Sequence, residues 1–249
     1  DRWARLIDEI SEPDADFFSD NFVSNETSYL QVADQLADQP TGGAYIGVGP
    51  EQNFTYIALT KPRFAYLLDI RRDNLVLHLL YKAAFDVATS RAHFLAVLTG
   101  RPHVAAGDPG AAGSLEQVMA HVDKSESSAA DFSTTHKLLS ARIATYRIEL
   151  DERDRRTLKR THRAFSKSGL DLRFTLKEKS YRKYPSLREL LVAKTPQGAQ
   201  RGFMASAADF RFVQAMQRDN RIIPLVGDFG GERALPTLAA HMKKNHQTL

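Results

Sequence analysis

The sequence predicts an α/β fold with a doubly wound, largely parallel sheet. Two glycines, Gly47 and Gly49, end an apolar stretch, and a helix pattern follows them at 52–60. The next apolar stretch, 64–69, ends in Asp69, which lies 22 positions after Gly47. Strand, glycine turn, helix, strand and acidic end form a unit in which helix amides and the acid can bind a nucleoside.

The glycine turn lacks the groups that a dinucleotide or a nucleoside triphosphate requires. Gln52 stands where the dinucleotide pattern has its third glycine, and the chain has no G-x-x-x-x-G-K-[ST] loop. A ligand without a pyrophosphate needs only a shorter turn. The stretch resembles motif I of the class I S-adenosylmethionine-dependent methyltransferases, and Asp69 stands in the place of their ribose-binding acid.

This resemblance implies a cofactor site made by the turn, by the end of the second strand and by a later strand end. The pattern differs from the family at Tyr45, which replaces an acid, and at Glu51, which replaces the family's third glycine. The residues implied for binding S-adenosylmethionine are Tyr45, Gly47, Val48, Gly49, Gln52, Asn53, Asp69, Ile70, Arg71, Asp228 and Phe229.

A wider resemblance points to the same fold. The stretch 17–29, the turn G-V-G-P-E-Q-N and the later I-I-P-L-V-G-D-F-G-G are similar to a group of uncharacterised bacterial proteins with a methyltransferase-like fold. The similarity extends over most of the chain. It implies a Rossmann-like sheet of methyltransferase type, but it implies no substrate.

Methyl transfer from a sulfonium needs an acceptor held in line and a group that takes its proton. Asp228 follows the apolar stretch 222–227 and, in a parallel sheet, lies at the same edge as the glycine turn. We therefore expect Asp228 to act as the base, assisted by Glu26 and Tyr29 from the N-terminal region. The alternative is that Asp228 only caps the helix that includes 234–242.

Two functions follow from these residues. The first is a methyltransferase that binds S-adenosylmethionine and whose acceptor is a small molecule or a protein. The second is a catalytically inactive, methyltransferase-like protein that uses the pocket for ligand sensing or for an interaction, and Tyr45 and Glu51 favour it. A metal site has no support, because the eight histidines lack H-x-x-x-H and H-E-x-x-H spacing.

We expect a helical N-terminal cap at 1–40 and a Rossmann-like domain at 41–249 with a helical insertion at about 100–205. A methyltransferase sheet has seven strands, but only one helix fits between Asp228 and Leu249. We therefore expect a sheet that is incomplete at the C-terminus, or a chain that is a fragment.

The region 17–29 mixes aromatic and small polar residues before a helix pattern over 29–36. Because this helix directly precedes the first strand, we expect its N-terminal end to fold over the cofactor pocket. The alternative is that Asn21, Ser24 and Asn25 only form turns and a helix cap.

Hydrophobic periodicity predicts the other elements. The helix that starts at 73 is apolar on nearly all sides, so we expect it between two layers, with His78 as a satisfied buried side chain. We also expect a strand over 170–176 and loops over 103–113 and 124–135. Further helices are expected over 115–122, 136–146, 151–168 and 209–218, and over 86–98 the preceding helix continues or restarts.

The composition is that of an ordinary globular protein, with 43% hydrophobic and 26% charged residues. The chain has no cysteine, no run of about 18 apolar residues and no signal-peptide pattern. We therefore expect no membrane span and a cytoplasmic location, although the chain begins without methionine. The sequence carries no signal for an oligomeric state.

Two basic patches raise the alternative of nucleic-acid binding. The portion 151–163 has six basic and three acidic residues, and 177–188 has five basic and one acidic residue with Tyr181 and Tyr184 between them. Aromatic side chains between cations suit single-stranded nucleic acid. The overall balance, 34 basic against 30 acidic residues, argues against a dedicated nucleic-acid-binding protein.

Overall fold

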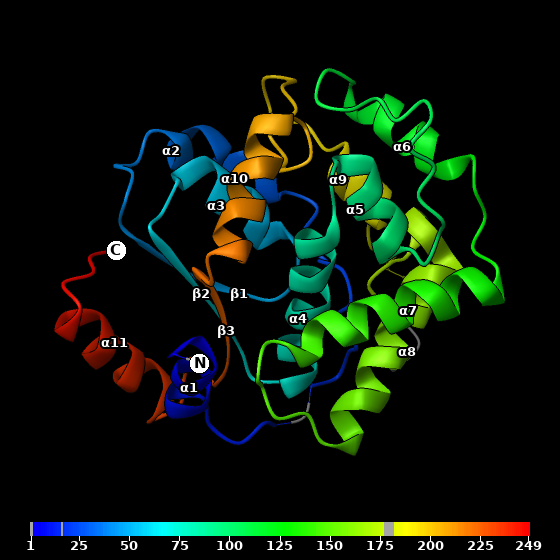
Figure 1. Cartoon of the computed structure of the whole chain (residues 1–249). Helices are drawn as coiled ribbons and strands as arrows, with labels where there is room; N and C mark the ends of the chain where they lie inside the picture. Colours follow the sequence, from blue (N-terminus) through cyan, green and yellow to red (C-terminus); the bar gives the residue numbers. More distant parts are fainter. Residues whose placement is uncertain (1, 16, 177–181) are drawn as a thin grey trace.

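The architecture is a small parallel sheet with helices on both faces (Figure 1). The computed structural model describes residues 2–15, 17–176 and 182–249. The expected α/β class with parallel strands is confirmed. The strands lie side by side in the order β1 (Ala44–Val48), β2 (Phe64–Asp69) and β3 (Ile222–Val226).

The helices follow the sequence pattern closely. Those expected over 52–60, 115–122, 151–168 and 209–218 are confirmed to within two residues at each end. The α-helices are α1 (Arg2–Ile10), α2 (Ala33–Ala37), α3 (Gln52–Thr60), α4 (Arg72–Val87), α5 (Arg91–Leu98), α6 (Leu115–Asp123), α7 (Ala129–Ala144), α8 (Glu152–Ser168), α9 (Leu187–Leu191), α10 (Ala207–Arg218) and α11 (Ala234–Lys244), and the 3-10 helices are η1 (Tyr29–Val32) and η2 (Gly169–Asp171).

β2 is the central strand, and every residue after Phe64 is buried. Its unbroken apolar run is typical of a parallel strand that is covered on both faces. β3 is an edge strand of the described sheet, which explains why Pro224, which has no amide hydrogen to donate, is tolerated there.

The order of the strands in the sheet is the same as their order in the chain. Both crossovers therefore move in the same direction, and the described strands contain no reversal of order. Helices α3, α4 and α10 contact one another, whereas α1 and α11 lie together on the other side of the strands (Figure 1).

α4 is the central helix of the molecule. It is buried from Asn74 to Phe85 and lies between the sheet and the pair α7 and α8 (Figure 1). The expected helix between two layers is therefore confirmed.

Two expectations around the insertion are wrong. Residues 170–176 form no strand: η2 occupies their start, and only single bridges, Arg173 to Ser186 and Leu176 to Ser19, follow. The loop expected over 124–135 is largely helix, because a capping box of Ser128 and Asp131 starts α7 at Ala129.

The helix expected to continue or restart over 86–98 restarts: α4 ends at Val87, and Ser90 caps α5 by accepting from the amide of His93. The helix expected over 29–36 is divided into η1 and α2. Ser24 does not cap it, because its hydroxyl accepts from the amide of Glu26 in a local turn.

Candidate functional site

The glycine turn follows β1, and Asp69 is the last residue of the neighbouring strand β2. Both therefore lie at the same edge of the sheet. Val48 of β1 pairs with Leu68 of β2, so Gly49 lies beside Asp69. Gly49 has a φ of +81°, a left-handed conformation that favours glycine. We call this part of the molecule the carboxyl edge.

Gly47 makes room for side chains of the protein itself. The hydroxyl of Tyr45 donates to Oδ1 of Asn53 at 2.7 Å, and Nδ2 of Asn53 donates to the carbonyls of Val48, Gly49 and Pro50 at 2.9–3.0 Å. A Cβ at position 47 would lie 2.1 Å from Asn53 Oδ1 and 2.6 Å from the Tyr45 hydroxyl. The face of the turn at Gly47 is therefore filled by the Tyr45–Asn53 pair.

Glu51 brings a buried carboxylate to the start of α3. Both of its oxygens accept from the amide of Ser24, at 3.0 and 3.2 Å, and its side chain is buried. Burial raises the pKa of the carboxyl to about 7. The side chain of Glu51 makes no capping hydrogen bond to the amides of α3, so it links the start of this helix to Ser24.

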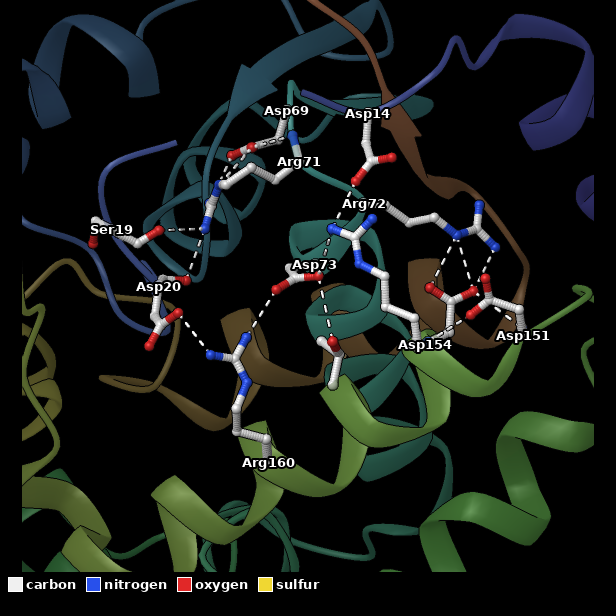
Figure 2. A network of polar contacts seen from close by, with 12 residues as sticks. Asp14, Ser19, Asp20, Asp69, Arg71, Arg72, Asp73, Asp151, Asp154 and Arg160 are labelled. Carbon is white, nitrogen blue, oxygen red and sulfur yellow. Dashed lines mark hydrogen bonds and ion pairs between the residues drawn. The ribbon is translucent and has the colours of Figure 1, made fainter. Parts of the chain in front are cut away.

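Asp69 has a built-in cationic partner. Arg71 donates from Nε to Oδ1 at 3.1 Å and from Nη2 to Oδ2 at 3.2 Å, and its backbone amide also donates to Oδ1 at 2.9 Å. Figure 2 shows the guanidinium turned back onto the carboxylate. Both oxygens that would accept from a ribose are therefore engaged.

The same guanidinium holds a stretch of chain that is far away in sequence. Nη1 of Arg71 donates to the carbonyl of Asp20 at 2.7 Å and to that of Ser19 at 3.3 Å (Figure 2). Residues 19–24, which we call the N-terminal segment, thus lie over the carboxyl edge, held by Arg71 at one end and by Glu51 at the other.

α8 reinforces this arrangement from outside. Arg160 donates to the carboxylates of Asp20 and Asp73, each at 2.8 Å, and Arg153 contacts Asp14 at 2.9 Å. Figure 2 shows these ion pairs joining α8, the start of α4 and the N-terminal region. The expectation that the N-terminal region covers this edge therefore has a physical basis in a charged network.

Two buried polar side chains of α4 face the carboxyl edge without a full set of partners. Nε2 of His78 lies 2.9 Å from the carbonyl of Gly49, and burial lowers the pKa of the ring to about 4. The neutral ring therefore donates from Nε2, which leaves Nδ1 as an acceptor. Within the described residues, His78 Nδ1 and both amide atoms of Asn74, one helical turn earlier, have no partner.

The remaining residues implied for the cofactor lie around the same edge. Gln52 donates from Nε2 to the carbonyl of Val48 at 3.0 Å. The carbonyl of Ile70 accepts from Ala15 at 3.0 Å, so the N-terminal region also covers the end of β2. Phe229 is exposed and follows β3.

The three candidate catalytic residues are not brought together. β3 pairs with β2 rather than with β1, so Asp228 is separated from the glycine turn by a whole strand, and neighbouring strands are about 4.8 Å apart. Asp228 accepts from the amide of Gly230 at 2.8 Å and so forms a local turn. Tyr29 donates to the carbonyl of Leu190 at 2.8 Å, and Glu26 is exposed.

The basic patch of α8 is partly internal. Arg153 and Arg160 pair with acids of the N-terminal region and α4, and Arg156 pairs with Glu152. In the second patch, Arg188 pairs with Asp123 and Asp171, whereas 177–181 lie outside the described residues. Much of the charge that suggested nucleic acid therefore stabilises the fold.

Sequence reasoning did not identify Arg71 as the anchor of the N-terminal segment, or Asn74 as part of the site. One signal was available: Asn74 and His78 are polar and four residues apart on a helix that is otherwise mostly apolar from 75 to 85. The part played by Ser24 left no signal, because it depends on a contact with Glu51, 27 residues away.

Within the described residues, none of the helices combines the length and apolar character needed to cross a membrane, and no three His, Cys, Asp or Glu side chains are grouped to hold a metal ion. A protein family described as "Domain of unknown function (DUF7790)" matches residues 21–249. No curated protein matches the chain.

Proposed function

The chain belongs to the DUF7790 family, and we propose that it is a ligand-responsive protein rather than an active methyltransferase. In this proposal the carboxyl edge binds S-adenosylmethionine or its demethylated product, and binding releases the N-terminal segment. The proposed fold is a Rossmann-like sheet of methyltransferase type, and the three strands would be one half of that sheet.

The observation that carries the proposal is the double use of Arg71. Its guanidinium binds both oxygens of Asp69 and also the carbonyls of Ser19 and Asp20. Arg71 donates three hydrogen bonds to Asp69, and a carboxylate accepts about four, so a ribose that donates from two hydroxyls must displace at least one bond from Arg71. Binding of the ligand and docking of the N-terminal segment therefore oppose each other, and each weakens the other by the same factor.

The unpartnered groups of Asn74 and His78 support a polar ligand at this edge. Buried polar groups in folded proteins normally have partners, so those that lack one call for an explanation. The amide of Asn74 offers both a donor and an acceptor, and Nδ1 of His78 offers an acceptor. An adenine ring, with its amino group and ring nitrogens, matches these groups.

The arrangement of the catalytic candidates favours the inactive function. A general base must come within about 3 Å of the proton it removes, directly or through one water. Asp228 lies two strands away from the glycine turn and is used in a turn of its own. Glu26 is exposed, and the Tyr29 hydroxyl donates to the carbonyl of Leu190 in α9, so neither side chain is placed to assist Asp228 as a base.

Calorimetry with S-adenosylmethionine and with its demethylated product tests this function. We expect heat of binding for the wild-type protein and binding weaker by about tenfold or more for Asp69→Asn, because a charge-assisted hydrogen bond is lost. Asp219→Asn is the matched control, since it removes an exposed acid that pairs with Arg221 at the far end of α10. Absence of heat with both ligands, or equal affinity of the Asp69→Asn variant, would contradict the proposal.

A further inference from the structure

A groove between α7 and α8 gathers positive charge. It has a volume of about 580 Å³ and is lined from α7 by His136 and Lys137 and from α8 by Lys159 and Arg163. No carboxylate is among its lining residues. The groove lies on the outer side of these helices, away from the sheet, and shares no residue with the carboxyl edge.

The cations of this groove differ from the others on α8. Arg153, Arg156 and Arg160 each have a carboxylate within 3.0 Å. Lys137, Lys159 and Arg163, in contrast, form no salt bridge with any residue that the structure describes. Like charges that share a site without a counterion repel one another, and a bound anion relieves that repulsion.

The protonation of His136, which also lines the groove, is set by its contact with His162. Nε2 of His162 lies 3.0 Å from the carbonyl of Val97, so it carries a hydrogen and donates. The pKa of His162 is lowered by burial to about 4, so its Nδ1 is a bare acceptor. Nδ1 of His136, 3.2 Å away, must then be the donor. Burial and the nearby Lys159 and Arg163 lower the pKa of His136, so its Nε2 is an acceptor and adds no donor to the groove.

We propose that this groove binds the phosphate group of a small molecule. A tetrahedral phosphate has several oxygens that can accept at once from a guanidinium fork and from ammonium groups. Ser133 and Ser140 of α7 line the same groove and offer hydroxyl donors. The volume falls within the range of small-ligand sites, about 300–1,000 Å³.

Free phosphate and a phosphate ester both have oxygens that can accept from these groups, and calorimetry distinguishes the two ligands. The probes are inorganic phosphate, ribose 5-phosphate and unphosphorylated ribose, at constant ionic strength. We expect ribose not to bind. Tighter binding of ribose 5-phosphate than of phosphate indicates an ester as the ligand, whereas equal affinity indicates the free ion.

Two double variants with the same change in charge test the residues. Lys159→Ala/Arg163→Ala removes two groove cations, and Arg156→Ala/Lys167→Ala removes two cations of α8 outside the groove. We expect the first to weaken phosphate binding by about tenfold or more and the second to change it less than about twofold. Absence of binding by both phosphate probes, or equal weakening in both variants, would overturn the proposal.

A single-stranded RNA oligonucleotide completes the experiment. If RNA binds more tightly than ribose 5-phosphate and both double variants weaken it equally, the cations form an extended nucleic-acid surface and the small-molecule site is wrong. If RNA binding is weak and salt-dependent while the phosphate probes discriminate between the variants, the proposal is supported. Because the groove and the carboxyl edge lie on different elements, either proposal can fail without the other.

Discussion

Arg71 donates to both carboxylate oxygens of Asp69, at 3.1 and 3.2 Å, although the two residues are only two positions apart. Both side chains are buried, with 8% and 6% exposure. A bidentate pair of this kind is strong and directional. Arg71 also donates to the carbonyls of Ser19 and Asp20. Asp69, which the sequence indicates as a ribose ligand, therefore binds the same guanidinium that anchors the N-terminal segment.

Replacement of Arg71 by alanine tests this anchor. We expect hydrogen exchange over 19–24 to rise by about tenfold or more, because each lost hydrogen bond to a charged group contributes about 1.5–3 kcal/mol. Arg72→Ala is the control, since it breaks a half-buried pair with Asp154 next to the site without touching the segment. If exchange over 19–24 rises equally in both variants, the effect is general destabilisation and the anchor is refuted.

Gly47→Ala tests whether the turn is filled by the protein itself. The new Cβ would collide with Asn53, so we expect a loss of about 3 kcal/mol of stability in denaturant unfolding. Gly107→Ala is the control: Gly107 has a φ of +75° and no atom within 4 Å of the added Cβ, so only backbone strain of about 1 kcal/mol is expected. A Gly47→Ala variant as stable as the wild type would show that Tyr45 and Asn53 leave the turn open.

The raised pKa of Glu51 predicts that the stability of the protein depends on pH. Its pKa is about 7 in the folded protein, above the usual value of 4.5, so the folded state holds its proton more tightly than the unfolded state. Stability from this group is therefore fully present below about pH 4.5 and is lost as the pH rises to about 7, by about 3 kcal/mol.

Glu51→Gln isolates this contribution, because the variant keeps an acceptor for Ser24 but does not titrate. The difference in unfolding free energy between the variant and the wild type should grow in favour of the variant from pH 4.5 to pH 7. His78 changes stability in the opposite direction, since its pKa of about 4 makes the protein lose stability as the pH falls from 6.5. A constant difference between Glu51→Gln and wild type across this range would contradict the buried, protonatable carboxyl.

Asp228→Ala separates a sensor from an enzyme. If Asp228 only closes the turn with Gly230, the variant should bind S-adenosylmethionine as the wild type does, and neither protein should transfer labelled methyl groups to components of a lysate. Transfer by the wild type that is lost in Asp228→Ala, with binding intact, would restore the methyltransferase function.

The parallel sheet and most helices follow from local signals. The glycine turn, the apolar run of β2 and the caps of α8 and α10 are all readable from neighbouring residues. The strand expected over 170–176 fails for a physical reason: Leu170, Leu172 and Phe174 are indeed buried alternately, but no strand pairs with them beyond single bridges. An alternating hydrophobic pattern indicates that one side of a segment is buried, whereas a strand also needs a second strand to pair with.

The site is predictable only in part. That Gly49 and Asp69 lie together follows from two parallel strands joined by a helix. That residues 19–24 cover this edge does not follow from the sequence, because Arg71 holds the carbonyl of Asp20, 51 positions earlier, and Arg160 holds its carboxylate from 140 positions later. Contacts at such separations leave no pattern in one sequence.

Hydrogen exchange at residues 19–24, with and without S-adenosylmethionine or its demethylated product, tests the central claim most directly. The amide of Asn21 is the reporter, because it donates to the Ser19 hydroxyl at the end of the segment that Arg71 holds, whereas the amide of Ser24 is held by Glu51. If a ligand displaces Arg71 from Asp69, binding detected by calorimetry should be accompanied by faster exchange at Asn21 and its neighbours. Binding with unchanged or slower exchange in this segment would contradict the proposed competition.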